Sequence, residues 1–175
     1  METGLIHIYC GDGKGKTTAA VGLGVRCLGR GGRVLFLQFL KDNRSGEIGV
    51  LEKISGFRFL RGKPVIGFSH RFTEEQRLEY AAIHDYNIRE AVRICREESI
   101  DMLVLDEAVG AYALNLLDRQ ALLHFLKNKP VALEIVLTGR NPAPELTELA
   151  DYVSEMKKIK HPYDRGIQAR RGIEK

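Results

Sequence analysis

Short runs of apolar residues recur along the chain, separated by stretches in which apolar positions repeat every three to four residues. Five of the runs are rich in Val, Ile, Leu and Phe, which is typical of strands buried on both faces. They are residues 5–10, 34–39, 57–60, 102–105 and 132–137. A weaker sixth run covers residues 152–156. Because strands that alternate with helices form parallel sheets, the pattern predicts an α/β fold: an open, mainly parallel sheet with helices on both faces.

Three helices are expected between these strands. The first covers about residues 17–30 and ends at a pair of glycines, a common stop signal. The longest begins at Thr73, where Thr-Glu-Glu-Gln fits a capping box. A further helix begins near residue 118 and ends before the proline at 130. The predicted buried stripe of the longest helix is Leu78, Ala82, Ile88, Val92 and Cys95.

The remaining connections are expected to be loops, at residues 41–47, 61–72, 138–144 and 157–175. In an open parallel sheet, ligands bind outside the carboxyl ends of the strands. Three of these loops leave strands at that edge, and so does the glycine-rich segment that follows the first strand. The binding site is therefore expected at this edge of the sheet.

The glycine-rich segment directly after the first strand has the pattern of a phosphate-binding loop. Glycines let the backbone curl so that the N–H groups of residues 13–18 point at phosphate oxygens, and the following helix adds its positive end. Lys16 is expected to reach the terminal phosphates, and the Thr17 hydroxyl is expected to bind Mg²⁺. The predicted ATP-binding residues here are Gly11, Asp12, Gly13, Lys14, Gly15, Lys16, Thr17 and Thr18. Cys10 stands where such loops usually have their first glycine, which leaves open whether this is an ordinary ATPase.

Two carboxylates, Asp106 and Glu107, follow the apolar run at residues 102–105. In phosphate-loop proteins, an acidic residue at this position orients Mg²⁺ beside the Thr of the loop. Together with Thr17, these two residues are the predicted metal ligands, and the sequence leaves open which of them touches the metal. A Glu after the strand-end Asp could also act as a base for an attacking water, so hydrolysis is an alternative.

The histidines divide into two groups. His7 lies in a predicted strand, and His84 and His124 lie in predicted helices, where packed or surface roles are expected. His161 lies in a charged loop and is a candidate for contact with a ligand.

Composition limits the classes of protein that the chain can belong to. Its 175 residues suit a single domain, residues 1–175, and 44% hydrophobic with 29% charged residues is typical of a soluble globular protein. No apolar run approaches the roughly 20 residues that cross a bilayer, so no membrane association is expected. Three scattered cysteines and no signal-peptide pattern favour the cytoplasm. The net charge of +4 comes from dispersed residues, so no nucleic-acid partner is expected.

Several further segments have distinctive sequences. They are Arg26, the pair Gln38 and Phe39, and residues 103–107, 137–140, 148–151, 160–163 and 166–174. With residues 11–20, they resemble the ATP:corrinoid adenosyltransferase family, of the cob(I)yrinic acid a,c-diamide type, over nearly the whole chain. The last segment is the most specific, because a general phosphate-loop ATPase has no reason to carry it. The family is also similar in lacking the first glycine of the loop.

The resemblance implies a P-loop NTPase-like (RecA-like) fold and an unusual use of ATP. A cobalt(I) corrinoid attacks the 5′ carbon of the ribose, and tripolyphosphate leaves. ATP as co-substrate, Mg²⁺, a flavoprotein reductant and a homodimer follow from the family. Lys16, Arg26 and Phe68 are the implied catalytic residues, and Arg26, Thr138 and Arg140 are implied to bind ATP.

Two departures from the family are expected to matter. Phe68 matches an aromatic residue thought to press on the lower face of the corrin, but His70 stands where Trp is typical in some members. The first strand begins almost at once, so we expect the N-terminal helix of longer members to be missing. Two alternatives to adenosyl transfer stay open: an ATPase or kinase with Glu107 as base, and a nucleotide-gated corrinoid-binding protein.

Overall fold

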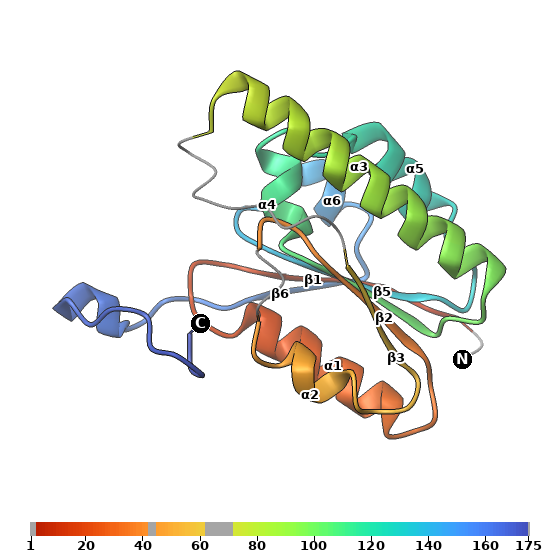
Figure 1. Cartoon of the computed structure of the whole chain (residues 1–175), viewed down its shortest axis with the longest axis horizontal. Coiled ribbons are helices and arrows are strands. Elements are labelled where there is room, and N and C mark those ends of the chain that lie inside the picture. Colours follow the sequence, from red (N-terminus) through yellow and green to blue (C-terminus); the bar gives the residue numbers. More distant parts are fainter. Residues whose placement is uncertain (1–2, 42–44, 62–71, 175) are drawn as a thin grey trace.

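The centre of the molecule is one six-stranded sheet, in a computed structural model that describes residues 3–41, 45–61 and 72–174 (Figure 1). The strand order is β3-β2-β4-β5-β1-β6, and every pair is parallel. The strands are β1 (Ile6–Cys10), β2 (Val34–Gln38), β3 (Phe57–Leu60), β4 (Met102–Asp106), β5 (Glu134–Thr138) and β6 (Tyr152–Glu155). The predicted P-loop NTPase-like (RecA-like) fold class is confirmed, and the weak sixth run is a strand.

Helices cover both faces of this sheet (Figure 1). On one face lie α1 (Lys16–Leu28) and α2 (Ile48–Leu51). On the other lie α3 (Glu74–Glu97), α4 (Ala108–Ala113), α5 (Arg119–Lys127) and α6 (Pro144–Thr147). Because neighbouring residues of a strand point to opposite faces, each face has its own apolar core. Phe36 and Val104 pack in the core under α1, whereas Leu35 and Leu103 pack in the core under α3.

The long helix α3 begins as predicted, but part of its predicted buried stripe is exposed. Thr73 and Gln76 form the capping box, with the Thr73 hydroxyl accepting the Gln76 N–H at 3.3 Å. Leu78 is 66% exposed, and Ala82 is exposed as well. A helix of 24 residues is about 36 Å long, whereas a five-residue strand spans only about 17 Å. The first turns of α3 therefore have no sheet to pack against.

Three short helices follow strands or loops for which no helix was predicted. These are α2, α4 and α6, of four, six and four residues. Helices this short show less than two turns of a hydrophobic repeat, so the periodicity that indicates a helix is lacking.

The segment after β6 leaves the sheet and projects from it, as the blue ribbon in Figure 1 shows. It contains one 3₁₀ turn, η2 (Pro162–Arg165), and most of its residues are exposed. Among the described helices, none is both long enough and apolar enough to span a membrane.

Candidate functional site

Met156, directly after β6, forms backbone hydrogen bonds with the glycine-rich loop between β1 and α1 and with the end of β1. The Gly13 N–H donates to the Met156 carbonyl at 2.7 Å, and the Met156 N–H donates to the Cys10 carbonyl at 2.8 Å. A Cβ atom at Gly13 would lie 2.6 Å from the Met156 oxygen, so only glycine fits. The amide of Gly13, expected to face phosphate, is directed to Met156 instead.

The first turn of α1 supplies the remaining amides of the predicted phosphate cradle. Gly15 is the N-cap of the helix, which begins at Lys16. The N–H groups of the N-cap and of the first three helical residues have no carbonyl partner within a helix. Here they belong to Gly15, Lys16, Thr17 and Thr18, so this end of α1 is suited to an anion.

The Lys16 side chain is folded back over the loop. Its ammonium donates to the Gly13 carbonyl at 2.9 Å, and the residue is only 9% exposed. Burial lowers the pKa of Lys16, and the neighbouring carboxylate of Glu107 opposes that fall. A partly desolvated ammonium at the mouth of the loop is a strong partner for phosphate oxygens.

Asp106, the last residue of β4, is fully buried and accepts four hydrogen bonds. Its Oδ1 accepts from the hydroxyls of Thr17 at 2.8 Å and Thr138 at 2.7 Å. Its Oδ2 accepts from Gln38 Nε2 at 3.2 Å and from Lys41 Nζ at 2.6 Å. The structure therefore brings together the Thr of the loop and the strand-end Asp, as expected, and adds Lys41 between them.

Glu107 adopts a backbone conformation that is rare for residues other than glycine. Its φ is 62°, in the left-handed region. The Glu107 N–H donates to the Thr138 hydroxyl at 2.9 Å, which holds this conformation and starts α4 at the next residue. Non-glycine residues in this region are found often at functional sites.

The Glu107 carboxylate lies among several charges. Burial raises its pKa, and the adjoining Asp106 raises it further. The cations Lys41, Lys16 and Arg140 oppose this rise. The Glu107 carboxylate at the end of β4 is therefore surrounded by one other carboxylate and three cationic side chains.

The turn after β5 brings Arg140 to the phosphate loop. Gly139 has a φ of 148°, and a Cβ there would lie 2.7 Å from Val109 Cβ in α4, so a side chain at this position would be excluded. The charge of the exposed Arg140 acts on the pKa values of Lys16, Glu107 and Asp12. Thr138 and Arg140 are therefore near the loop, at the edge where they were expected.

Asp12 points to the segment after β6. Its Oδ1 accepts the N–H of Lys158 at 3.0 Å, and this hydrogen bond lowers the pKa of Asp12. The Asp12 carboxylate therefore holds the C-terminal segment against the loop, in addition to the contact of Gly13 with Met156.

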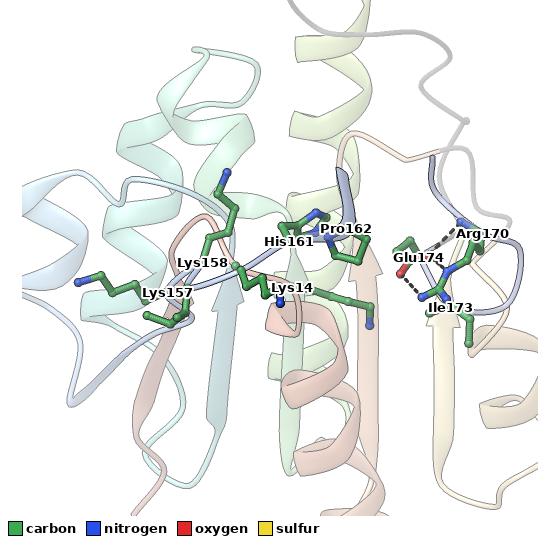
Figure 2. Close-up of a pocket in the computed structure, with 11 residues that line it drawn as sticks. Lys14, Lys157, Lys158, His161, Pro162, Arg170, Ile173 and Glu174 are labelled. Atoms are coloured by element: carbon green, nitrogen blue, oxygen red, sulfur yellow. Dashed lines mark hydrogen bonds and ion pairs between the residues drawn. The ribbon is translucent and has the colours of Figure 1, made fainter. Parts of the chain in front are cut away.

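A pocket of about 450 Å³ lies between the phosphate loop and the C-terminal segment (Figure 2). Its cationic lining residues are Lys14, Lys157, Lys158, Lys160 and Arg170, with His161 beside them. The carboxylate in this lining, Glu174, accepts three hydrogen bonds from Arg170, two from its guanidinium and one from its backbone N–H, which lower the pKa of Glu174 to about 2. The pocket is therefore a basic basin that adjoins the loop through Lys14. His161, a candidate for ligand contact, lies in it.

Arg26 is not brought to this site. Arg26 lies ten residues after Lys16 on α1, about 15 Å along the helix axis. It lines a separate pocket with Asp101 and Glu134, at the amino ends of the strands. A role for Arg26 at the triphosphate of its own chain is therefore not supported by the structure. Phe68 and His70 lie outside the described residues.

Two residues at the end of β2 were not predicted as site residues, although Gln38 was part of the resemblance. Gln38 pairs with Asp106 across β2 and β4, and Lys41 reaches the same carboxylate. Lys41 follows a predicted strand, at the edge where ligands were expected. That position was the only signal in the sequence, because nothing there indicates that β2 lies beside β4.

The described residues contain no group of three or more His, Cys, Asp or Glu side chains that could hold a metal. Mg²⁺ is usually bound through only one or two carboxylates together with substrate phosphates and water. The oxygen donors of Asp106 and Thr17 lie within hydrogen-bonding distance of each other and suit this mode of binding.

Known proteins match the chain over nearly its whole length. A family model described as ATP:corrinoid adenosyltransferase BtuR/CobO/CobP matches residues 2–174. A corrinoid adenosyltransferase of Escherichia coli is 34% identical, over 99% of this chain and 86% of the relative. One from a Sinorhizobium species is 35% identical over 99% of this chain and 81% of the relative. The corrinoid adenosyltransferase CobA of Salmonella typhimurium is 33% identical, with 99% and 86% covered.

The family model and these relatives agree with the geometry of the site. A phosphate loop, a strand-end Asp and a buried Lys are the groups that an ATP-dependent transferase needs. The chain belongs to the ATP:corrinoid adenosyltransferase family, whose members use ATP to adenosylate corrinoids.

Proposed function

We propose that the chain binds the triphosphate of ATP along residues 11–18 and transfers the 5′-deoxyadenosyl group to the cobalt(I) of cob(I)yrinic acid a,c-diamide or cob(I)alamin. The family supports the reaction class. The observation that carries the assignment to this site is the arrangement of Lys16, Thr17 and Asp106 around the start of α1. ATP and the corrinoid are the two substrates.

The bond changes explain why such a site needs no catalytic base. Cobalt(I) supplies the electron pair that forms the cobalt–carbon bond and is thereby oxidised to cobalt(III). The bond between C5′ and its oxygen breaks, and tripolyphosphate leaves with the electron pair of that broken bond. No proton has to be removed, so the protein must orient the 5′ carbon and stabilise the charge of the leaving group.

In this proposal, Lys16 and Arg140 stabilise the departing tripolyphosphate, together with the amides at the start of α1. Thr138 acts through Asp106 and Glu107, which it positions. Lys14 extends the positive surface into the basic basin. Arg26 has no part in this account, because it lies at the other end of α1.

We include Mg²⁺ in the proposal because Asp106 and Thr17 fit it. When bound, Mg²⁺ would neutralise part of the charge on the triphosphate. Asp106 and Thr17 would hold it, and Glu107 lies beside them. The fully buried Asp106 carboxylate, which accepts hydrogen bonds from four side chains, is suited to this role.

Three further proposals rest on the resemblance to the family. Phe68 presses on the lower face of the corrin, with His70 beside it as a flat ring. A flavoprotein supplies the electron that makes cobalt(I). The chain acts as a homodimer. From composition and length, we also propose that the chain acts in the cytoplasm and that its 175 residues form one domain.

The deciding experiment is an anaerobic incubation of the protein with ATP, Mg²⁺ and a chemically reduced corrinoid, followed by identification of both products. We expect an adenosylated corrinoid and intact tripolyphosphate. ADP or orthophosphate would instead indicate an ATPase or kinase with Glu107 as base. Tight corrinoid binding without any product would indicate a carrier. Running the assay with each corrinoid separately identifies the preferred substrate.

A further inference from the structure

Lys41 lies between the two groups that the proposed Mg²⁺ site requires. Its ammonium is 2.6 Å from Asp106 Oδ2 and 3.3 Å from Thr17 Oγ1. In phosphate-loop enzymes, Mg²⁺ is held by a Thr or Ser of the loop and by a strand-end Asp. The ammonium therefore lies beside the same pair of oxygens that would bind the metal.

The backbone directs Lys41 to this position. The Phe39 N–H donates to the Asp106 carbonyl at 2.9 Å, which extends the pairing of β2 with β4 beyond the strand end. Leu40 then adopts a φ of 53°, in the left-handed region, and packs against the apolar core. Such a conformation persists in a residue other than glycine only when its surroundings hold it. The turn at Leu40 sends the chain back toward the end of β4, where the Lys41 side chain is only 26% exposed.

Asp106 also needs a cation. A fully buried carboxylate is strongly unfavourable unless it is paired and hydrogen-bonded. The other three donors to Asp106 are the neutral groups of Thr17, Thr138 and Gln38. Within the described part of the chain, Lys41 is the single cationic side chain in hydrogen-bond contact with this carboxylate.

We propose that Lys41 competes with Mg²⁺ for Asp106 and is displaced from this carboxylate when Mg²⁺ binds with ATP. This inference rests on the proposed Mg²⁺ site and adds a residue to it. An ammonium and Mg²⁺ would repel each other at one carboxylate, since Mg²⁺ binds its oxygens at about 2.0–2.1 Å. Displacement frees the Lys41 ammonium to turn toward the triphosphate.

The consequence is competition between Lys41 and the metal. Before ATP binds, Lys41 keeps the affinity of Asp106 and Thr17 for the metal low, so that Mg²⁺ enters together with the nucleotide. Removing the ammonium should therefore tighten metal binding in the absence of ATP.

The test uses Mn²⁺ alone as a paramagnetic probe, titrated into the full-length, nucleotide-free protein and followed by electron paramagnetic resonance. Lys41→Met should bind Mn²⁺ at least tenfold more tightly than the wild type, and Lys41→Gln should behave in the same way. Lys41→Arg keeps the cation and should stay near the wild type. Lys127→Met, which removes one exposed charge from α5, is the matched control for net charge and should change nothing.

Salt separates direct displacement from a long-range charge effect. The Debye length falls from about 10 Å at 0.1 M to about 3 Å at 1 M ionic strength. The tenfold difference should therefore persist in 1 M KCl. Lys41→Met should also unfold at a lower temperature than the wild type in EDTA, and Mn²⁺ should restore much of that loss.

Several outcomes would overturn the inference. Unchanged, weaker or absent Mn²⁺ binding in Lys41→Met would show that Lys41 does not compete with a metal at Asp106. A difference that disappears in 1 M KCl, or that Lys127→Met reproduces, would indicate only a general effect of charge. The assay contains neither ATP nor corrinoid. A failed product assay with tighter Mn²⁺ binding in Lys41→Met would therefore remove the proposed reaction and leave this inference standing.

Discussion

The hydroxyl of Thr138, at the end of β5, donates to Asp106 Oδ1 at the end of the neighbouring β4, with 2.7 Å between the oxygens. The same hydroxyl accepts the N–H of Glu107 at 2.9 Å. A hydroxyl has one proton, so its two roles are fixed: it donates to the carboxylate and accepts from the backbone. One buried side chain thus positions both of the acidic residues.

Thr138→Val should therefore lower both stability and activity. Valine has nearly the same shape, but it leaves the Glu107 N–H without a partner and removes one donor from Asp106. An unsatisfied buried group costs about 1–3 kcal/mol, and we expect a loss of that size in the free energy of unfolding measured with urea. The Michaelis constant for Mg²⁺–ATP should rise as well.

Thr138→Ser is the matched control, because it keeps the hydroxyl. It should retain the wild-type response to Mg²⁺, with only the smaller loss expected from removing a methyl group. Equal behaviour of the Val and Ser variants would show that the hydroxyl does not position the acidic pair.

Asp106→Asn and Glu107→Gln should differ in severity. The four side chains around Asp106 all donate hydrogen bonds to it, so the NH₂ group of an Asn amide would face other donors. The amide also lacks the negative charge that pairs with Lys41. We expect activity to fall at least about 100-fold, equivalent to about 2.7 kcal/mol. Glu107→Gln should cost less, because a cobalt(I) nucleophile requires no base.

A titration with Mg²⁺ at saturating ATP compares these two variants. If both variants keep the wild-type dependence on Mg²⁺, the metal is bound elsewhere and the two carboxylates at the end of β4 have only a structural role. A larger loss in Glu107→Gln than in Asp106→Asn would instead support a base, and with it hydrolysis.

Lys16→Ala should abolish turnover while the fold is kept. Among the described residues, its ammonium makes one hydrogen bond, to the Gly13 carbonyl. A charge-assisted contact to phosphate contributes about 1.5–3 kcal/mol or more, so ATP binding and the rate of transfer should both suffer. Lys14→Ala, at an exposed position of the same loop, should have a smaller effect. Wild-type rates in Lys16→Ala at saturating ATP would remove the assignment of this loop to triphosphate.

The main features of the site could be predicted because they lie within short segments. The residues of the phosphate loop are consecutive, and Asp106 directly follows an apolar run. A sheet with parallel strands then places both segments at one edge. Thr138 and Arg140 came from the resemblance to the family rather than from any local pattern.

The contacts that cross between strands could not be predicted. Lys41 reaches Asp106 only because β2 lies beside β4 and because Leu40 turns into the left-handed region. Neither the strand order nor that turn has a signal in a single sequence, since Leu is not a residue that favours positive φ. The contact of Gly13 with Met156 likewise depends on β6 pairing with β1.

The prediction of the buried stripe of α3 was partly wrong, because it depends on how the helix lies on the sheet. Leu78 and Ala82 have helical spacing, but α3 extends beyond the strands that could cover them. Arg26, which came from the resemblance to the family, lies on the same helix as Lys16 but several turns away. Spacing along a helix predicts which residues share a face, and it does not predict what lies opposite that face.

His84 on α3 is a buried imidazole that should make stability depend on pH. It is 1% exposed, and its Nδ1 lies 2.7 Å from the Leu116 carbonyl. Its ring packs edge-on against Phe39, and its Nε2 has no hydrogen-bond partner among the residues that the structure describes. Burial lowers the pKa of His84, and the Leu116 carbonyl and the nearby charge of Asp85 oppose that fall.

The sign of the effect follows from that lowered pKa. The unfolded chain binds a proton at this imidazole near its ordinary pKa of about 6.5, whereas the folded chain binds it only at lower pH. The stabilisation is therefore present in full above about pH 6.5 and decreases as the pH falls toward the folded pKa, by at most about 1.4 kcal/mol per pH unit.

His84→Gln keeps a donor for the Leu116 carbonyl but cannot take up a proton, so its free energy of unfolding should change less between pH 7.5 and 5.5. Urea unfolding across this range measures both slopes, and His124→Gln, at an exposed position of α5, is the control. A His84→Gln slope as steep as that of the wild type would show that other groups cause the acid sensitivity.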